Sequence, residues 1–129
     1  MAGAMLPGHQ ITRIDSTAKL GRDVVFVTIA NFGHSHLFCS KDGGQTWEDV
    51  DRGQLPDVPH HAVVIQPDKP QVVYVGNDAG VFVSRDSGMT WMNMTANLPN
   101  AMVVDLVLQQ KDGTLSAATY GRSLWRIGI

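Results

Sequence analysis

The sequence holds little that could cross-link the chain or carry it into a membrane. Only one of its 129 residues is a cysteine, Cys39, so no disulfide can form within the chain. Its apolar neighbours predict a buried, unreactive thiol. No hydrophobic run approaches the roughly 20 residues that a membrane-spanning helix needs. The first ten residues lack the basic start and apolar centre of an export signal, and residues 1–9 are interpreted as a short leader or cloning remnant.

Charge is also scarce, and neither sign forms a long run. Ten basic and twelve acidic residues give a formal net charge of −2, and charged residues make up 17% of the chain. Binding to nucleic acid or to an anionic membrane surface needs a concentrated basic face, so neither partner is expected. Apolar residues make up 43% of the sequence, which is typical of an ordinary globular domain.

What the sequence does have is an internal repeat. Residues 40–47 return as residues 84–91, a shift of 44 positions, and both copies read Ser-x-Asp-x-Gly-x-Thr-Trp. The apolar segments upstream of each copy also correspond, as do the Leu-Pro pairs at residues 6, 55 and 98. A period of about 40 to 45 residues made of short strands is typical of β-propeller blades.

Turn-forming residues divide each repeat into short strands rich in β-branched and aromatic residues. The first repeat is expected to place strands near 11–15, 24–29, 36–40 and 46–50, and the second near 62–66, 72–76, 81–85 and 90–95. A third repeat offers strands at 102–108, 114–119 and around 123–125, with no fourth. The sequence therefore predicts an all-β chain, a β-propeller fragment of about three four-stranded antiparallel blades (10–52, 60–97 and 101–129) whose last blade lacks its fourth strand.

The repeated motif falls at the sharp turn between the third and fourth strands. There, an Asp side chain can accept hydrogen bonds from backbone amides that the strand ladder leaves unpaired. The glycine is expected to adopt a positive φ angle, and the Trp to bury its ring in the core. The residues with this structural role are Ser40, Asp42, Gly44, Thr46 and Trp47 in the first copy, and Ser84, Asp86, Gly88, Thr90 and Trp91 in the second.

The motif resembles the Asp-box, or BNR, repeat of sialidases, sortilin-type receptor domains, xyloglucan-degrading glycoside hydrolases and photosystem II stability factors. Residues 113–126 also resemble the final blade of the glycosidase-like members. This resemblance implies a β-propeller in which the Asp box is structural, so it indicates a fold and not an activity. It also implies that ligands bind on the face opposite the Asp boxes, at the mouth of the central channel.

That opposite face, here called the loop face, is formed by the loops between second and third strands and by the connections between repeats. Polar residues gather in these segments, and the first of these loops is the longest. They are candidates for binding a carbohydrate or a protein, although polar loop residues are often merely solvated. The candidates are Asn31, His34, His36, Asp57, His60, His61, Asn77, Asp78, Tyr120 and Arg122.

Metal-ion and catalytic chemistry are poorly supported. The pairs His34/His36 and His60/His61 each supply two ligands at most, whereas zinc usually needs three or four, so no metal or other cofactor is expected. A sialidase-like site needs three arginines and a Tyr–Glu pair, but Arg122 is the only arginine expected on the loop face. A xyloglucanase-like site needs two facing aspartates. No motif marks the pair expected there as catalytic, and we expect no enzymatic activity from this chain.

Three functional hypotheses remain open. The first is a non-catalytic propeller module that self-assembles and binds a carbohydrate or protein on its loop face. The second is a C-terminal piece of a larger glycoside hydrolase, and the third is a structural scaffold without a ligand. Propellers typically close with four to eight blades, and an open row of three leaves strand edges and apolar faces in water. We therefore expect a homodimer in which two chains form a six-bladed ring.

Overall fold

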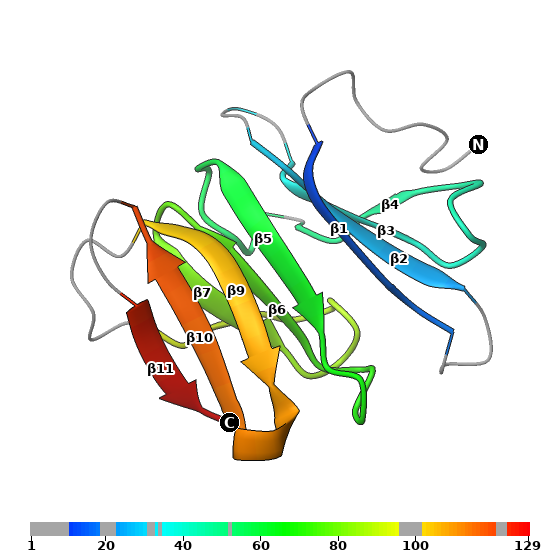
Figure 1. Ribbon diagram of the computed structural model, residues 1–129. Coiled ribbons are helices and arrows are strands. Elements are labelled where there is room, and N and C mark those ends of the chain that lie inside the picture. Colours follow the sequence, from blue (N-terminus) through cyan, green and yellow to red (C-terminus); the bar gives the residue numbers. More distant parts are fainter. Residues whose placement is uncertain are drawn as a thin grey trace.

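The structure is a computed structural model, and it describes residues 11–18, 23–30, 33, 35–51, 53–95, 102–120 and 124–129. The described chain forms three antiparallel sheets, in each of which the neighbouring strands follow one another in the sequence (Figure 1). Blade 1 contains β1 (Ile11–Thr17), β2 (Val24–Ile29), β3 (Leu37–Ser40) and β4 (Glu48–Asp49). Blade 2 contains β5 (His60–Ile65), β6 (Val73–Asn77), β7 (Gly80–Ser84) and β8 (Met92–Asn93). Blade 3 contains β9 (Val103–Gln109), β10 (Thr114–Thr119) and β11 (Leu124–Gly128).

The predicted all-β fold, with a third sheet of three strands, is confirmed. The fourth strands, however, are only two residues long, shorter than predicted. The reason is that the residues before them belong to the turn, where amides bond to the Asp side chain instead of the strand ladder. A 3₁₀ turn, η1 (Gln110–Asp112), links β9 to β10. No helix among the described residues is long and apolar enough to cross a membrane.

Each blade also has a register shift near the beginning of its first strand. Pairing with the second strand skips one residue in every blade, namely Thr12, His61 and Val104. An extra residue at such a bulge bends the strand and redirects its side chain. Ile11, His60 and Val103 therefore occupy equivalent positions, and this register defines the residue equivalences used below.

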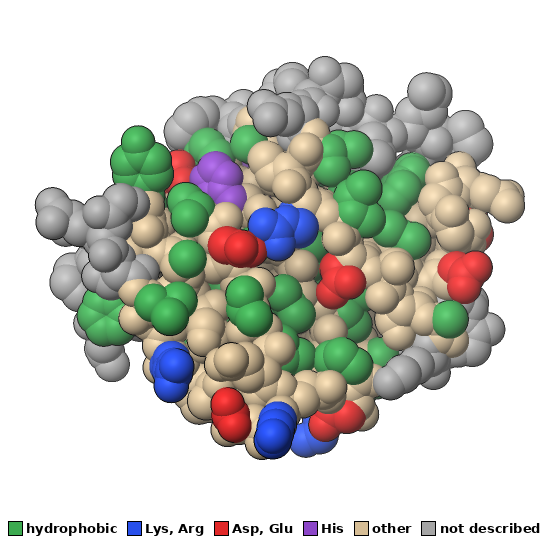
Figure 2. Space-filling view, viewed as in Figure 1, with side chains coloured by type: hydrophobic (Ala, Val, Ile, Leu, Met, Phe, Trp, Pro, Cys, Tyr) green, Lys and Arg blue, Asp and Glu red, His purple; other side chains and the backbone are tan. Residues whose placement is uncertain are grey.

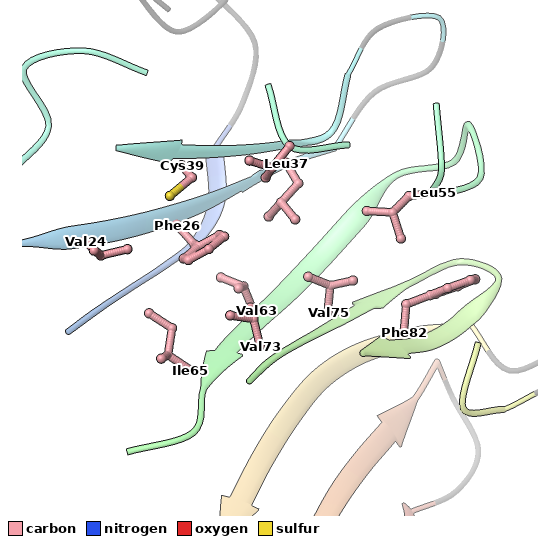
Figure 3. Close-up of a cluster of buried hydrophobic side chains, with 11 residues drawn as sticks. Val24, Phe26, Leu37, Cys39, Leu55, Val63, Ile65, Val73, Val75 and Phe82 are labelled. Atoms are coloured by element: carbon pink, nitrogen blue, oxygen red, sulfur yellow. The ribbon is translucent and has the colours of Figure 1, made fainter. Parts of the chain in front are cut away.

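Two apolar clusters fill the two junctions between neighbouring blades. The first joins blades 1 and 2, and Figure 3 shows its side chains pointing toward one another from β2, β3, β5, β6 and β7. Its centre includes Phe26, Leu37, Val63 and Val75, all 2% exposed or less. The second cluster joins blades 2 and 3 around Val81, Leu106 and Leu115. Cys39 forms no disulfide and is buried in the first junction, as expected.

The first strands of the three blades, β1, β5 and β9, lie side by side (Figure 1). An apolar groove of about 690 Å³ runs across their ends and is lined by residues such as Ser16, Ile65 and Val107. In Figure 2 hydrophobic side chains lie across this side of the molecule, with scattered acidic and basic side chains among them. The ion pair between Arg13 on β1 and Asp105 on β9, 2.8 Å long, joins the two outer members of the three.

The two motif tryptophans are only partly buried, less than expected, because each lies at the edge of its blade and not in the core. Trp91 is partly buried against the first cluster, and its Nε1 donates to the Val50 carbonyl oxygen of blade 1 at 3.2 Å. The side chain of Gln54 reinforces this contact, donating to Met89 O and accepting from Trp91 N. Trp47 holds the equivalent place in blade 1 and is also partly exposed. Among the described residues it has no corresponding partner.

Candidate functional site

The two motif turns, residues 40–47 and 84–91, have nearly the same hydrogen bonds. Asp42 accepts from the backbone N of Thr46 at 2.9 Å and from its Oγ1 at 2.6 Å. Asp86 accepts from Thr90 in the same way, at 2.8 and 2.6 Å. The Ser that begins each turn accepts from the glycine amide, and that glycine has φ of 99° in the first turn and 95° in the second.

These contacts stabilise the charged carboxylates. The Thr hydroxyl and amide groups lower the pKa of Asp42 and of Asp86 to about 2. Both oxygens of each aspartate accept from the threonine of their own turn, as a structural role requires. The motif turns therefore organise the hairpins.

On the loop face, the loop after β2 meets the connection between blades 1 and 2. Asp57 Oδ1 accepts from the backbone N of Gly33 at 2.7 Å and lies 3.1 Å from His36 Nε2. The side chain of Asp57 is 62% exposed. Its second oxygen has no hydrogen-bond partner among the described residues. One carboxylate oxygen is thus fixed by the protein, and the other is open to solvent.

His36 lies between this carboxylate and a second, buried one. Its Nδ1 is 2.7 Å from Asp51 Oδ2, and the same oxygen accepts from the backbone N of His36 at 3.0 Å. Both His36 and Asp51 are buried. The Asp51–His36–Asp57 cluster therefore places one imidazole between a buried carboxylate and an exposed acceptor.

A second histidine supports the first from blade 2. The His60 ring stacks on the His36 ring, with centroids 4.8 Å apart. Burial is the main cause that lowers the pKa of His60 to about 4, so its ring is neutral near pH 7. In that state Nδ1 donates to Val58 O at 2.9 Å, and Nε2 accepts from Asn77 Nδ2 at 3.1 Å. His60 and Asn77 are fully buried, so in this arrangement they position neighbours and present no polar atom at the surface.

Two of the other described loop-face candidates pair with each other. His61, the bulged residue of β5, pairs with Asp78 through Nε2 and Oδ1 at 2.8 Å, and both side chains are partly exposed. Tyr120 is exposed at the end of β10. Asn31, His34 and Arg122 lie outside the described residues. Ligand binding by any of these candidates stays a prediction.

A pocket of about 310 Å³ opens beside the cluster. Its size is at the lower end of the usual range for small-ligand sites. Carboxylates, an imidazole and glycine backbone surround it, with a single aliphatic side chain, Leu55. The lining residues are Gly33, Ser35, His36, Asp51, Gly53, Leu55 and Asp57. Within the described part of the chain, no group of three or more His, Cys, Asp or Glu residues is arranged to hold a metal ion.

Sequence reasoning missed Asp51, although the repeat contains a signal for it. A shift of 44 positions matches His36 with Gly80 and Asp51 with Thr95. In blade 2, Thr95 Oγ1 accepts from the backbone N of Val81 at 2.9 Å, and a Cβ built on Gly80 would lie 2.0 Å from that oxygen. Blade 2 thus has the smaller pair Gly80–Thr95 where blade 1 has His36–Asp51. A larger side chain at position 80 would clash with Thr95, so the residues at the two positions depend on each other sterically.

Comparisons with known proteins identify the fold and leave the site unassigned. No protein-family model and no curated protein sequence matches the chain. Among solved structures it is similar to a GH74 enzyme from Niastella koreensis, with a TM-score of 0.58 and 24% identity over 74% of this chain. It is also similar to the GH74 xyloglucanase from Xanthomonas campestris, with a TM-score of 0.61 and 21% identity over 80% of this chain. The chain covers only 15% and 19% of those two proteins, and it has the fold of a β-propeller segment like theirs.

Proposed function

We propose that the chain is a self-assembling β-propeller module of the Asp-box (BNR) class. It binds a carbohydrate or a protein in the pocket of its loop face and does not carry a complete catalytic site. The observation behind the proposal is the pair His36–Asp51, which stands where blade 2 has Gly80–Thr95. Both pairs fit the same blade geometry, so the fold itself does not require a buried imidazole and carboxylate at this position.

The contacts of the pair support a binding role for Asp57. Asp51 fixes one side of the His36 ring, and the other side holds Asp57 Oδ1. A carboxylate held in this way loses little side-chain entropy when a ligand arrives. Its free oxygen can accept from a sugar hydroxyl or from an N–H group of a protein.

The described residues also support the absence of catalysis. Each loop-face candidate carboxylate is paired with a histidine, Asp57 with His36 and Asp78 with His61. Cys39 is buried in a blade junction, where its Sγ donates to the backbone O of Ser40. Ser35, whose hydroxyl borders the pocket, bonds to the Asp49 carboxylate, and no bond from it to a histidine, the base that usually activates such a nucleophile, is seen among the described residues.

The test is binding to a glycan array that includes xyloglucan oligosaccharides, together with protein capture followed by titration of the purified partner. Asp57→Asn should weaken binding of the ligand found by about 10-fold or more, because a hydrogen bond to a charged acceptor is lost. The double variant His36→Gly with Asp51→Thr gives blade 1 the residues of blade 2. It should fold and lose binding. Asp112→Asn, an acid of the opposite turns, is the matched control.

Two results would contradict the binding proposal. One is a ligand that binds the Asp57→Asn variant as tightly as the parent. The other is a chain that binds nothing, which would favour the structural scaffold.

A second candidate function is a piece of a larger glycoside hydrolase. It is favoured by the GH74 enzymes among the similar structures and by the small share of them that the chain covers. Under this alternative the chain contributes part of a cleft whose catalytic acids lie elsewhere. A xyloglucan hydrolysis assay separates the two. Activity in a longer product of the same locus, together with none in the 129-residue chain, would favour the hydrolase.

A further inference from the structure

Among the described residues, one face of blade 1 lacks the neighbour that covers the same face in blade 2. We call this the leading face and define it by Ile14, Val25 and Phe38. Ile14 occupies the position of Val63, since each follows the bulge of its first strand by two residues and pairs across to the second strand. Val63 is packed against blade 1 and is 2% exposed, whereas Ile14 is 58% exposed. The difference comes from the missing neighbour, because both side chains are aliphatic.

The far side of blade 3 shows the reverse situation. We call it the trailing face and define it by Val107 and Leu124. Leu124 pairs with Ala118 as Val81 pairs with Gly76, so the two occupy the same place in their blades. Val81 lies under blade 3 with 0% exposure, but Leu124 is 61% exposed. Val107 on the same face is 52% exposed, and an exposed apolar patch, unlike a single exposed side chain, is typical of a surface that is covered in an assembly.

Both junctions inside the chain join a trailing face to a leading face. Phe26 and Leu37 of blade 1 meet Val63 of blade 2, and Val81 of blade 2 meets Leu106 of blade 3. The first junction is also fixed by the indole N–H of Trp91, which donates to blade 1. The chain thus contains two examples of the contact that the leading face of one copy could make with the trailing face of another copy.

We propose that a second copy of the chain covers both free faces at once, so that the leading face of each copy packs on the trailing face of the other. This rests on the proposed self-assembling propeller module and specifies its interface. A two-fold axis makes both junctions identical and leaves neither face free, which produces a ring of six blades. Arg126, also on the trailing face, can keep its guanidinium at the rim while its stem is covered.

Sedimentation equilibrium of the full chain at micromolar concentration tests the interface. The expected mass is twice the 14.0 kDa of one chain. Ile14→Glu and Leu124→Glu each place a charge in both junctions, and each should weaken the dimer by on the order of 100-fold or more. Since both side chains are exposed in the single chain, the variants should keep the circular dichroism spectrum of the parent. Met92→Glu, an exposed position of β8 outside both faces, is the matched control and should leave the dimer intact.

Mixing the two variants distinguishes this interface from any other pairing. A leading face with intact Ile14 and a trailing face with intact Leu124 are present in the mixture, so one junction can form between different variants. We expect dimers in the mixture at concentrations where each variant alone is monomeric. A parent chain of 14.0 kDa, dimers that withstand both substitutions, or a mixture that stays monomeric would overturn the proposal. A monomer that still shows binding dependent on Asp57 would overturn the ring alone and leave the ligand site standing.

Discussion

The imidazole rings of His36 and His60 lie stacked, with their centroids 4.8 Å apart and their planes at 16°. They belong to different blades, because His36 precedes β3 while His60 begins β5. The stack joins the pocket of the loop face to the core of the first blade junction. Burial keeps the His60 ring neutral near pH 7, so two charged rings do not face each other at this distance.

The pH dependence of stability should reveal the buried His60. Its pKa falls from an ordinary 6.5 to about 4 in the folded chain, so the unfolded chain takes up a proton first as pH decreases. The stabilisation that depends on a neutral His60 is fully present above pH 6.5 and is lost as pH falls from 6.5 to about 4. Its size is on the order of 3 kcal/mol. Urea unfolding across this range should show a flatter dependence for His60→Gln than for the parent, with His61→Gln as the control. Equal slopes for His60→Gln and the parent would refute it.

The threonines of the motif turns should control a second, more acidic loss of stability. The pKa of Asp86 is about 2, and its largest cause is the hydroxyl of Thr90. Since the folded pKa lies below the ordinary 3.8, this stabilisation is present above pH 4 and disappears as pH falls through about 2. Thr90→Val should raise the pKa of Asp86 toward its ordinary value, which carboxyl NMR titration measures. Thr46→Val should do the same for Asp42 and leave Asp86 unchanged. A pKa of Asp86 that stays near 2 in Thr90→Val would exclude this cause.

The two motif turns differ at one backbone position, which predicts a stabilising substitution. Ser87 has φ of 61°, and its equivalent in the first turn is Gly43 with φ of 73°. A side chain is disfavoured in this left-handed region. We expect Ser87→Gly to raise the free energy of unfolding by about 0.5 to 1 kcal/mol and Gly43→Ser to lower it by a similar amount. A Cβ on Gly43 would approach Asp23 no closer than 3.8 Å, so a clash does not explain the second effect. Thermal melts of both variants decide, and a destabilised Ser87→Gly would contradict the argument.

The tryptophans should differ in their effect on the stability of a single chain. Trp91 packs on the first core cluster and donates to Val50, whereas Trp47 lacks these contacts among the described residues. In the Ile14→Glu background, which we expect to be monomeric, Trp91→Ala should cost about 2 to 4 kcal/mol of unfolding free energy. Trp47→Ala should cost roughly 1 kcal/mol. Equal losses in chemical denaturation would mean that Trp47 has contacts that the described residues do not provide.

The blades could be predicted from the sequence because the repeat fixes their order. A shift of 44 residues aligned the hairpins, and alternation of strand and turn residues placed most strands within two residues of where they lie. The fourth strands were predicted too long because propensity does not show that an Asp side chain takes over amides of the ladder. Burial of the tryptophans was overestimated for another reason. It depends on which blade stands beside each ring, and a sequence pattern gives no such neighbour.

The candidate site was predicted only at the level of loops. Strand order predicted that His36, Asp57 and His60 lie at one end of the molecule. In the structure His36 contacts both of the others, Asp57 through Nε2 and His60 by stacking. The role of Asp51 could not be predicted from the sequence, because it depends on the Asp51 side chain reaching back to His36 within the same blade. The neutral state of His60 likewise follows from burial, which exists only once blades 1 and 2 have packed.

Consecutive strand order within each sheet has a consequence for how the chain folds. Every hydrogen-bonded strand pair joins sequence neighbours, so each blade can form its ladder without waiting for a distant part of the chain. The blades then behave as a row of coupled units, each stabilised by its own ladder and by its nearest neighbours. In a single chain only blade 2 has a neighbour on both sides, so it should open last, and amide exchange should be slowest in β6 and β7.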